Sequence, residues 1–209
     1  MATKFVYFFG NGKAEGLGTQ RTLLGGKGAG LAEMTNIGLP VPGGFTITTE
    51  VCKQYYDCGK KWPKGLEKQI RDALAKLEKA CKKKLGDARN PLLVSVRSGA
   101  AASMPGMMET VLNLGLNDRS VEGLAAKTGN ARFAWDSYRR FIQMYSTVVV
   151  GLSKDILESK LHDMKHRAGV NSDMELSAEN FRDLCGQFKQ FFREQKVGGH
   201  EAPDIVSGP

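Results

Sequence analysis

The hydrophobic pattern of the sequence changes near Asn117, and this change restricts the folds that the chain can adopt. Before it, short apolar runs typical of strands alternate with stretches whose apolar residues recur every three or four positions. After it, only the helical period remains. We therefore expect an α/β (α+β) protein with a mixed α/β lobe over residues 1–116, a helical subdomain over 117–196 and a turn-rich tail over 197–209.

Three runs in the first part have strand composition: residues 5–9, 45–48 and 92–96. The last run, LLVSV, is so apolar that we expect a buried strand. The residues after it, 97–117, are rich in Gly, Ala, Pro and Met and are typical of a loop. Two helices are expected between the strands. One covers residues 29–37, with Leu31, Met34 and Ile37 on one side, and the other covers 66–83 and ends before Gly86.

In the second part we expect a helix over residues 132–150, a second helix that begins after Ser153, and a third after Ser177. Both serines stand where a side-chain oxygen caps the first turn of a helix. The third helix carries apolar residues on one face, which we expect to be core: Phe181, Leu184, Cys185, Phe188, Phe191 and Phe192.

The bulk composition is that of an ordinary globular protein, with 41% hydrophobic and 25% charged residues. No apolar run is long enough to cross a membrane and no signal peptide is visible, so we expect a cytoplasmic protein without a membrane partner. The net charge is +8, but the lysines are not interleaved with aromatic residues, so we expect no nucleic-acid partner. The four cysteines fit no zinc pattern and are interpreted as reduced thiols.

The glycine-rich segment Gly25-Gly26-Lys27-Gly28-Ala29-Gly30 is the first candidate for chemistry. Its glycines let backbone N–H groups approach an anion closely, and it opens into an expected helix whose N-terminus favours negative charge. Lys27 adds a mobile positive charge. The segment is not a Walker A loop, because Arg21 stands where that motif has its first glycine. The alternative interpretation is a flexible turn before a helix.

Arg97 and the small residues after it form the second candidate. An arginine at the end of a buried strand is unfavourable unless it meets an acid or an anion, and its guanidinium can bind two phosphate oxygens at once. The following Gly, Ala and Ser residues let a backbone cover a ligand with little steric conflict. A structural salt bridge is the alternative, and the residues alone leave both interpretations open.

Two further pairs of residues have less specific patterns. His162 and His166 lie four residues apart, as helical zinc ligands do, but they have no third ligand nearby and we interpret them as an exposed polar face. Arg139 and Arg140 are either anion contacts or helix-surface charges, and we expect one of them to be structural.

Four segments resemble a known family: LLGGKGAGLAEM, GLPVPGGFTITTE, PLLVSVRSGAAASMPGMMETVLNLGLND and FAWDSYRRFIQMYS. Together they resemble the start of the pyruvate, phosphate dikinase family, and the resemblance extends from residue 5 to about residue 192. The related phosphoenolpyruvate synthases share GGKG and VRS and are the alternative. The longer stretches are more particular to the dikinases.

The resemblance implies an N-terminal lobe of an ATP-grasp-type nucleotide-binding domain with an inserted helical subdomain. In that family the domain binds Mg²⁺ and ATP and transfers phosphoryl groups to a histidine on a separate swivelling domain. A barrel domain then makes phosphoenolpyruvate from pyruvate. The overall reaction converts ATP, phosphate and pyruvate to AMP, pyrophosphate and phosphoenolpyruvate.

By match to the family's motifs, Lys27 and Arg97 are expected to contact the ATP phosphates and to assist catalysis as cations. The loop over residues 98–106 is expected to close over the triphosphate. Its expected contacts with the nucleotide are Ser98, Gly99, Ala100, Ser103, Met104 and Gly106. No metal ligand is expected in these 209 residues, because the family's Mg²⁺-binding carboxylates and its phosphorylated histidine lie downstream.

The resemblance also implies that these 209 residues lack part of the nucleotide site, so we expect the isolated chain to be catalytically inactive. A non-catalytic interaction protein made from this region is the alternative of a different class. The family forms dimers, but through domains that lie outside these residues. A peroxisomal or glycosomal location is the alternative to the cytoplasm, because a C-terminal address would not be visible here.

Overall fold

The computed structural model describes residues 3–99, 109–197 and 200–201, and it confirms a mixed α/β protein. Contacts divide the chain into two compact units. The first unit contains residues up to Lys82 together with Ser98 and Gly99, and the second contains Lys83–Arg97 and residues from Glu109 onward. Among the described residues, no helix is both long and apolar enough to cross a membrane.

The first unit is built on a three-stranded antiparallel sheet in which β1 (Val6–Gly10) lies between β2 (Lys13–Ala14) and β3 (Gly44–Ile47). The two residues that join β1 to β2 are Asn11 and Gly12, with φ values of 53° and 74°. Positive φ at both positions is the requirement of the tight hairpin turn that Asn-Gly favours. Strands β1 and β2 therefore form a hairpin.

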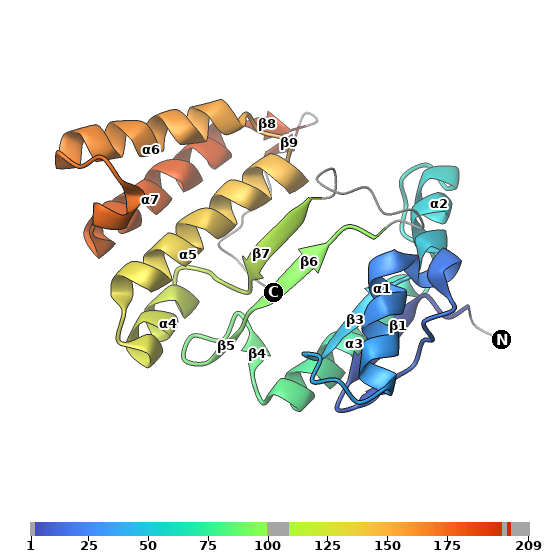
Figure 1. The fold of residues 1–209 in the computed structure, drawn as a ribbon. Helices are drawn as coiled ribbons and strands as arrows, with labels where there is room; N and C mark the ends of the chain where they lie inside the picture. Colours follow the sequence, from blue (N-terminus) through green and yellow to red (C-terminus); the bar gives the residue numbers. More distant parts are fainter. Residues whose placement is uncertain (1–2, 100–108, 198–199, 202–209) are drawn as a thin grey trace. The chain divides into compact units, whose positions relative to one another are not determined.

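Helices α1 (Arg21–Asn36) and α3 (Leu66–Cys81) pack on this sheet, and α2 (Thr49–Asp57) follows β3 directly (Figure 1). Val6 packs with residues of α3, whereas its neighbour Tyr7 packs with residues of α1. Because adjacent side chains of a strand point to opposite faces, the two helices cover opposite faces of the sheet.

The buried face of α1 differs from the expected one. Met34 and Ile37 are exposed, and the helix instead buries small residues such as Gly28, Ala29 and Ala32. Small side chains let the backbone of a helix approach a sheet closely, and this close contact outweighed the larger apolar residues in setting the orientation of the helix.

The second unit contains two short two-stranded sheets: β4 (Lys84–Leu85) with β5 (Pro91–Leu92), and β6 (Val94–Arg97) with β7 (Thr110–Leu114). Two expectations are wrong here. The expected buried strand is split at Leu93, and its second half is largely exposed because, among the described residues, β6 has β7 as its one neighbour. The expected loop after Arg97 includes β7.

From Ser120 to Glu194 the regular structure of the second unit is helical, as expected. The helical segments are α4 (Ser120–Thr128), α5 (Ala131–Met144), a π-helical turn (Tyr145–Val149), α6 (Lys154–Ala168), a 3₁₀ turn (Asp173–Glu175) and α7 (Ala178–Glu194). A short hairpin of β8 (Lys196–Val197) and β9 (His200–Glu201) follows α7.

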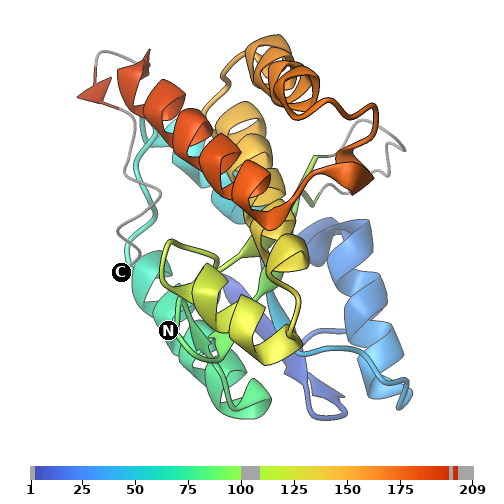
Figure 2. The same ribbon diagram turned by 90° about the vertical axis from the view of Figure 1, so that its left-hand side faces the viewer.

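The core of the second unit lies between α5 and α7, which are side by side in both views (Figures 1 and 2). Tyr138, Ile142, Phe181 and Phe188 are inaccessible to solvent there. All six residues expected on the buried face of α7 are buried. Cys185 is one of them, and burial raises the pKa of its thiol to about 12.

The compact units divide at a different position from the expected boundary at residue 116. Strand β7 packs on α5, and Leu93, Val111 and Leu114 join the core that the helices form. The strands β4 to β7 therefore fall in the same compact unit as the helices, where β7 contacts α5 and β5 contacts α4.

Candidate functional site

Helix α1 is interrupted at Gly25, whose φ of 70° and ψ of 164° are not helical. This conformation is accessible almost only to glycine. From the sequence we expected the glycine-rich segment to precede a helix. Instead it contains the break at Gly25, and its later residues already form the start of the longer helical part. One helical turn, Arg21–Leu24, comes before the break, and the longer part of α1 begins after it.

Lys27 lies in the first turn after this break and its side chain is exposed. An interruption of this kind leaves the following N–H groups without regular helical partners, as at the start of any helix. The Lys27 Nζ atom lies 3.4 Å from the carbonyl oxygen of Ser98, to which it donates a hydrogen bond. The structure thus brings together two of the residues expected from the sequence, and both belong to the first unit.

Two half-buried threonines contact the glycine-rich segment and the turn before it. A Cβ atom added to Gly28 would lie 2.7 Å from Cγ2 of Thr46 on β3, so only glycine fits there without displacement. The hydroxyl of Thr49, the first residue of α2, lies 2.6 Å from the carbonyl oxygen of Thr22. Sequence reasoning missed both threonines, because β-branched residues at the end of a strand are read as ordinary strand and cap residues.

Arg97 is the last residue of β6, where it pairs with Thr110, and it belongs to the second unit. Its side chain is exposed, so the premise that it ends a buried strand is wrong. Within the part of the chain that the structure describes, Arg97 forms no ion pair. The described residues therefore do not support the structural salt bridge, and a role of Arg97 in anion binding stays a prediction.

Part of the expected loop lies outside the described residues. Ser98 and Gly99 are described and exposed. Ala100, Ser103, Met104 and Gly106 fall outside, so their expected contacts with a nucleotide stay predictions. Over the ranges that the structure describes, no three His, Cys, Asp or Glu side chains are grouped as metal ligands would be.

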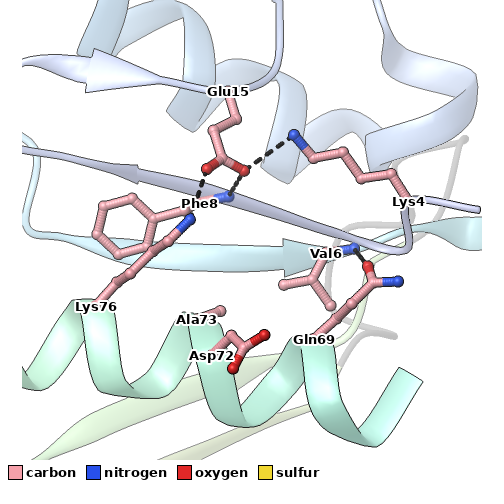
Figure 3. A pocket seen from close by; sticks show the side chains of 8 residues that line it. All are labelled: Lys4, Val6, Phe8, Glu15, Gln69, Asp72, Ala73 and Lys76. Atoms are coloured by element: carbon pink, nitrogen blue, oxygen red, sulfur yellow. Dashed lines mark hydrogen bonds and ion pairs between the residues drawn. The ribbon is translucent and has the colours of Figure 1, made fainter. Parts of the chain in front are cut away.

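A separate cavity of about 230 Å³ lies between β1 and α3 (Figure 3). Lys4 and Lys76 on its wall both pair with Glu15, at 3.1 and 3.0 Å. Gln69 accepts hydrogen bonds from the backbone N–H groups of Phe5 and Val6. Because these polar groups satisfy one another, the cavity offers little to recognise a ligand, and we do not regard it as the functional site.

The other residues considered from the sequence have structural or solvent-exposed positions. Arg139 is buried and pairs with Asp136 and Gln143, so it is the structural member of its pair. Arg140 is exposed and pairs with the same Asp136 at 3.1 Å. His162 and His166 are exposed on α6.

Comparisons with known proteins match the same family over most of the chain. A family model described as "Pyruvate phosphate dikinase, AMP/ATP-binding domain" matches residues 21–61 and 58–183. "Pyruvate, phosphate dikinase" of Rhizobium meliloti is 53% identical over 191 residues, which are 91% of this chain and 21% of that protein. The protein of the same name from Clostridium symbiosum is 53% identical over 200 residues, covering 96% and 22%.

A plant protein, "Pyruvate, phosphate dikinase 1, chloroplastic" of Zea mays, is 52% identical over 193 residues, covering 92% of this chain and 20% of that protein. The chain therefore spans about a fifth of the length of these curated relatives.

Proposed function

The chain belongs to the pyruvate phosphate dikinase AMP/ATP-binding domain family, and we propose that it forms the part of a pyruvate, phosphate dikinase that holds the phosphates of ATP. The observation that carries this proposal is the position of Lys27. It is exposed in the first turn after the break in α1, where a helix N-terminus and a cation favour the same anion.

The proposed chemistry is phosphoryl transfer, in which positioning and charge stabilisation supply most of the catalysis. Lys27 acts as a mobile point charge on a phosphate, and Arg97 supplies a second cation that can bind two oxygens at once. Ser98 and Gly99 begin the loop that covers the triphosphate, with Ala100, Ser103, Met104 and Gly106. The first unit is, in this proposal, the N-terminal lobe of an ATP-grasp domain, and the helices of the second unit are its insertion.

The phosphoryl group passes to a histidine in a part of the protein beyond these residues, and the whole enzyme converts ATP, phosphate and pyruvate to AMP, pyrophosphate and phosphoenolpyruvate. Mg²⁺ would neutralise charge on the phosphates. In this proposal the protein ligands of Mg²⁺ belong to the same further part of the protein, as the family resemblance implies.

The test uses the complete natural protein that contains this chain. In the Lys27→Ala variant we expect phosphorylation of the protein by β-labelled ATP to fall roughly 100-fold or more, because a preorganised cation is lost from the transferring group. Exchange of label between pyruvate and phosphoenolpyruvate should continue, since that half of the reaction does not use ATP. Full phosphorylation by ATP in Lys27→Ala would overturn the assignment.

Like Lys27→Ala, Arg97→Ala is expected to reduce phosphorylation of the protein by ATP. Its stability should stay within about 0.5 kcal/mol of the wild type, because the exposed side chain has no ion pair to lose among the described residues.

A requirement for inorganic phosphate in the overall reaction separates a dikinase from a phosphoenolpyruvate synthase.

A further inference from the structure

The break at Gly25 interrupts the helical hydrogen bonds of the backbone on both of its sides. N–H groups just after the break and carbonyl groups just before it lose their regular helical partners, as at the ends of any helix. The Thr49 hydroxyl meets two of these carbonyls. Its Oγ1 lies 2.6 Å from the oxygen of Thr22 and 3.3 Å from that of Leu23. A hydroxyl has one proton, so Thr22 is the main acceptor.

The adjacent threonine makes no such contact. Thr48 is 2% exposed, and its hydroxyl has no hydrogen-bond partner within the described part of the chain. The two residues have the same side chain and lie at the same junction between β3 and α2, yet only Thr49 reaches the broken helix. The contact with the broken helix is therefore specific to the Thr49 hydroxyl, and Thr48 serves as a matched comparison.

The contact anchors the turn before the glycine-rich segment at Thr22, and the close packing of Gly28 on Thr46 anchors the segment itself. Gly26 and Lys27 lie between these two anchors. A Cβ atom on Gly26 would meet nothing within 4 Å, so the middle of the segment has little packing of its own. The orientation of Lys27 therefore depends on its anchors.

We infer that Thr49 is a positioning residue for ATP: it holds the helical break so that Lys27 and the neighbouring N–H groups point at the phosphates. This inference rests on the proposed function. Thr49 itself does not touch the nucleotide. Removing its hydroxyl leaves the Thr22 carbonyl to water and lets the turn before Gly25 move, which displaces the groups that bind phosphate.

The test compares Thr49→Val, which removes the hydroxyl at nearly constant shape, with Thr49→Ser, which keeps it. In the complete protein we expect Thr49→Val to lower kcat/KM for ATP roughly tenfold, since small displacements of positioned groups have effects of this size or larger. KM for pyruvate should not change. Thr49→Ser should restore most of the loss, and Thr48→Val, the matched control, should behave as the wild type.

Amide hydrogen exchange supplies the second measurement. We expect faster exchange in Thr49→Val at Leu23 and Leu24, whose N–H groups donate to the Gln20 carbonyl in the turn before the break, with unchanged protection in α7. Wild-type kcat/KM for ATP and unchanged exchange in Thr49→Val would overturn the inference while leaving the proposed function intact. A general loss of protection, or a similar loss in Thr48→Val, would show a structural role only and would also overturn it. Failure of Lys27→Ala to lose activity would instead contradict the proposed function.

Discussion

A single carboxylate connects three parts of the first unit. Glu15 follows β2 and accepts hydrogen bonds from the N–H group of Phe8 on β1 and from Lys76 on α3, at 3.1 and 3.0 Å, and it also pairs with Lys4 (Figure 3). Partial burial opposes its ionisation, but the hydrogen bonds from Phe8, Lys76 and Lys4 outweigh burial and hold the pKa of Glu15 below its usual value.

We expect Glu15→Gln to lower the free energy of unfolding by about 0.5–1 kcal/mol at pH 7, the range for partly exposed ion pairs. A folded-state pKa below the unfolded value gives stability that is present above the ordinary carboxyl pKa and is lost as the pH falls through the folded pKa. Urea unfolding of wild type and Glu15→Gln at pH 7 and pH 3 measures how their difference in unfolding free energy depends on pH.

The difference between wild type and Glu15→Gln should shrink at the lower pH. An equal difference in unfolding free energy at both pH values would contradict a stabilising role of the Glu15 charge. Glu122→Gln is the matched control, because the Glu122 carboxylate lies 3.9 Å from Arg182 in an exposed pair and should contribute little.

At the scale of elements, the two serines expected as helix caps differ in the contacts they make. Ser177 accepts a hydrogen bond from the N–H of Asn180, and the Asn180 side chain bonds back to the N–H of Ser177. Ser153 occupies the same position before α6, but its side chain makes no capping bond. The sequence pattern located both helix starts and could not distinguish the two contacts.

Ser177→Ala should therefore destabilise the protein by about 1 kcal/mol, because an N–H group at the start of α7 loses its acceptor. Ser153→Ala should change stability by a few tenths of a kcal/mol at most, roughly its helix-propensity effect. Chemical unfolding followed by circular dichroism compares the two variants. Equal losses would show that the difference in capping has no energetic consequence.

At the scale of the whole molecule, each compact unit contains one of the two tryptophans. Trp62 in the first unit is 60% exposed, and Trp135 in the core of the second unit is 8% exposed. Trp62→Phe and Trp135→Phe therefore give versions of the chain in which fluorescence reports on one unit at a time.

We expect Phe188→Ala to destabilise the second unit by about 3–5 kcal/mol, because a fully buried ring is replaced by a cavity. The transition reported by Trp135 should move to lower denaturant concentration by more than the one reported by Trp62. Identical shifts at both tryptophans would indicate that the two units unfold as one cooperative body.

Much of the fold followed from local patterns. The helical period predicted α3, α5, α6 and the buried face of α7, and aromatic and β-branched runs predicted β1 and β3. These elements are predictable because their residues have one apolar side that any core would bury. Lys27 and Arg97 were also proposed as site residues from the sequence, because glycine next to a cation and an arginine before small residues are local features; their role stays a prediction.

The sequence by itself determined which segments are helices and strands in most of the chain, and which family it belongs to. The tertiary structure alone decided that small residues form the buried face of α1, that β4 to β7 belong with the helices, and that Thr49 rather than Thr48 contacts the broken turn. These properties depend on contacts between segments far apart in the chain, and a periodic pattern records only that a residue is apolar or polar, not what it meets.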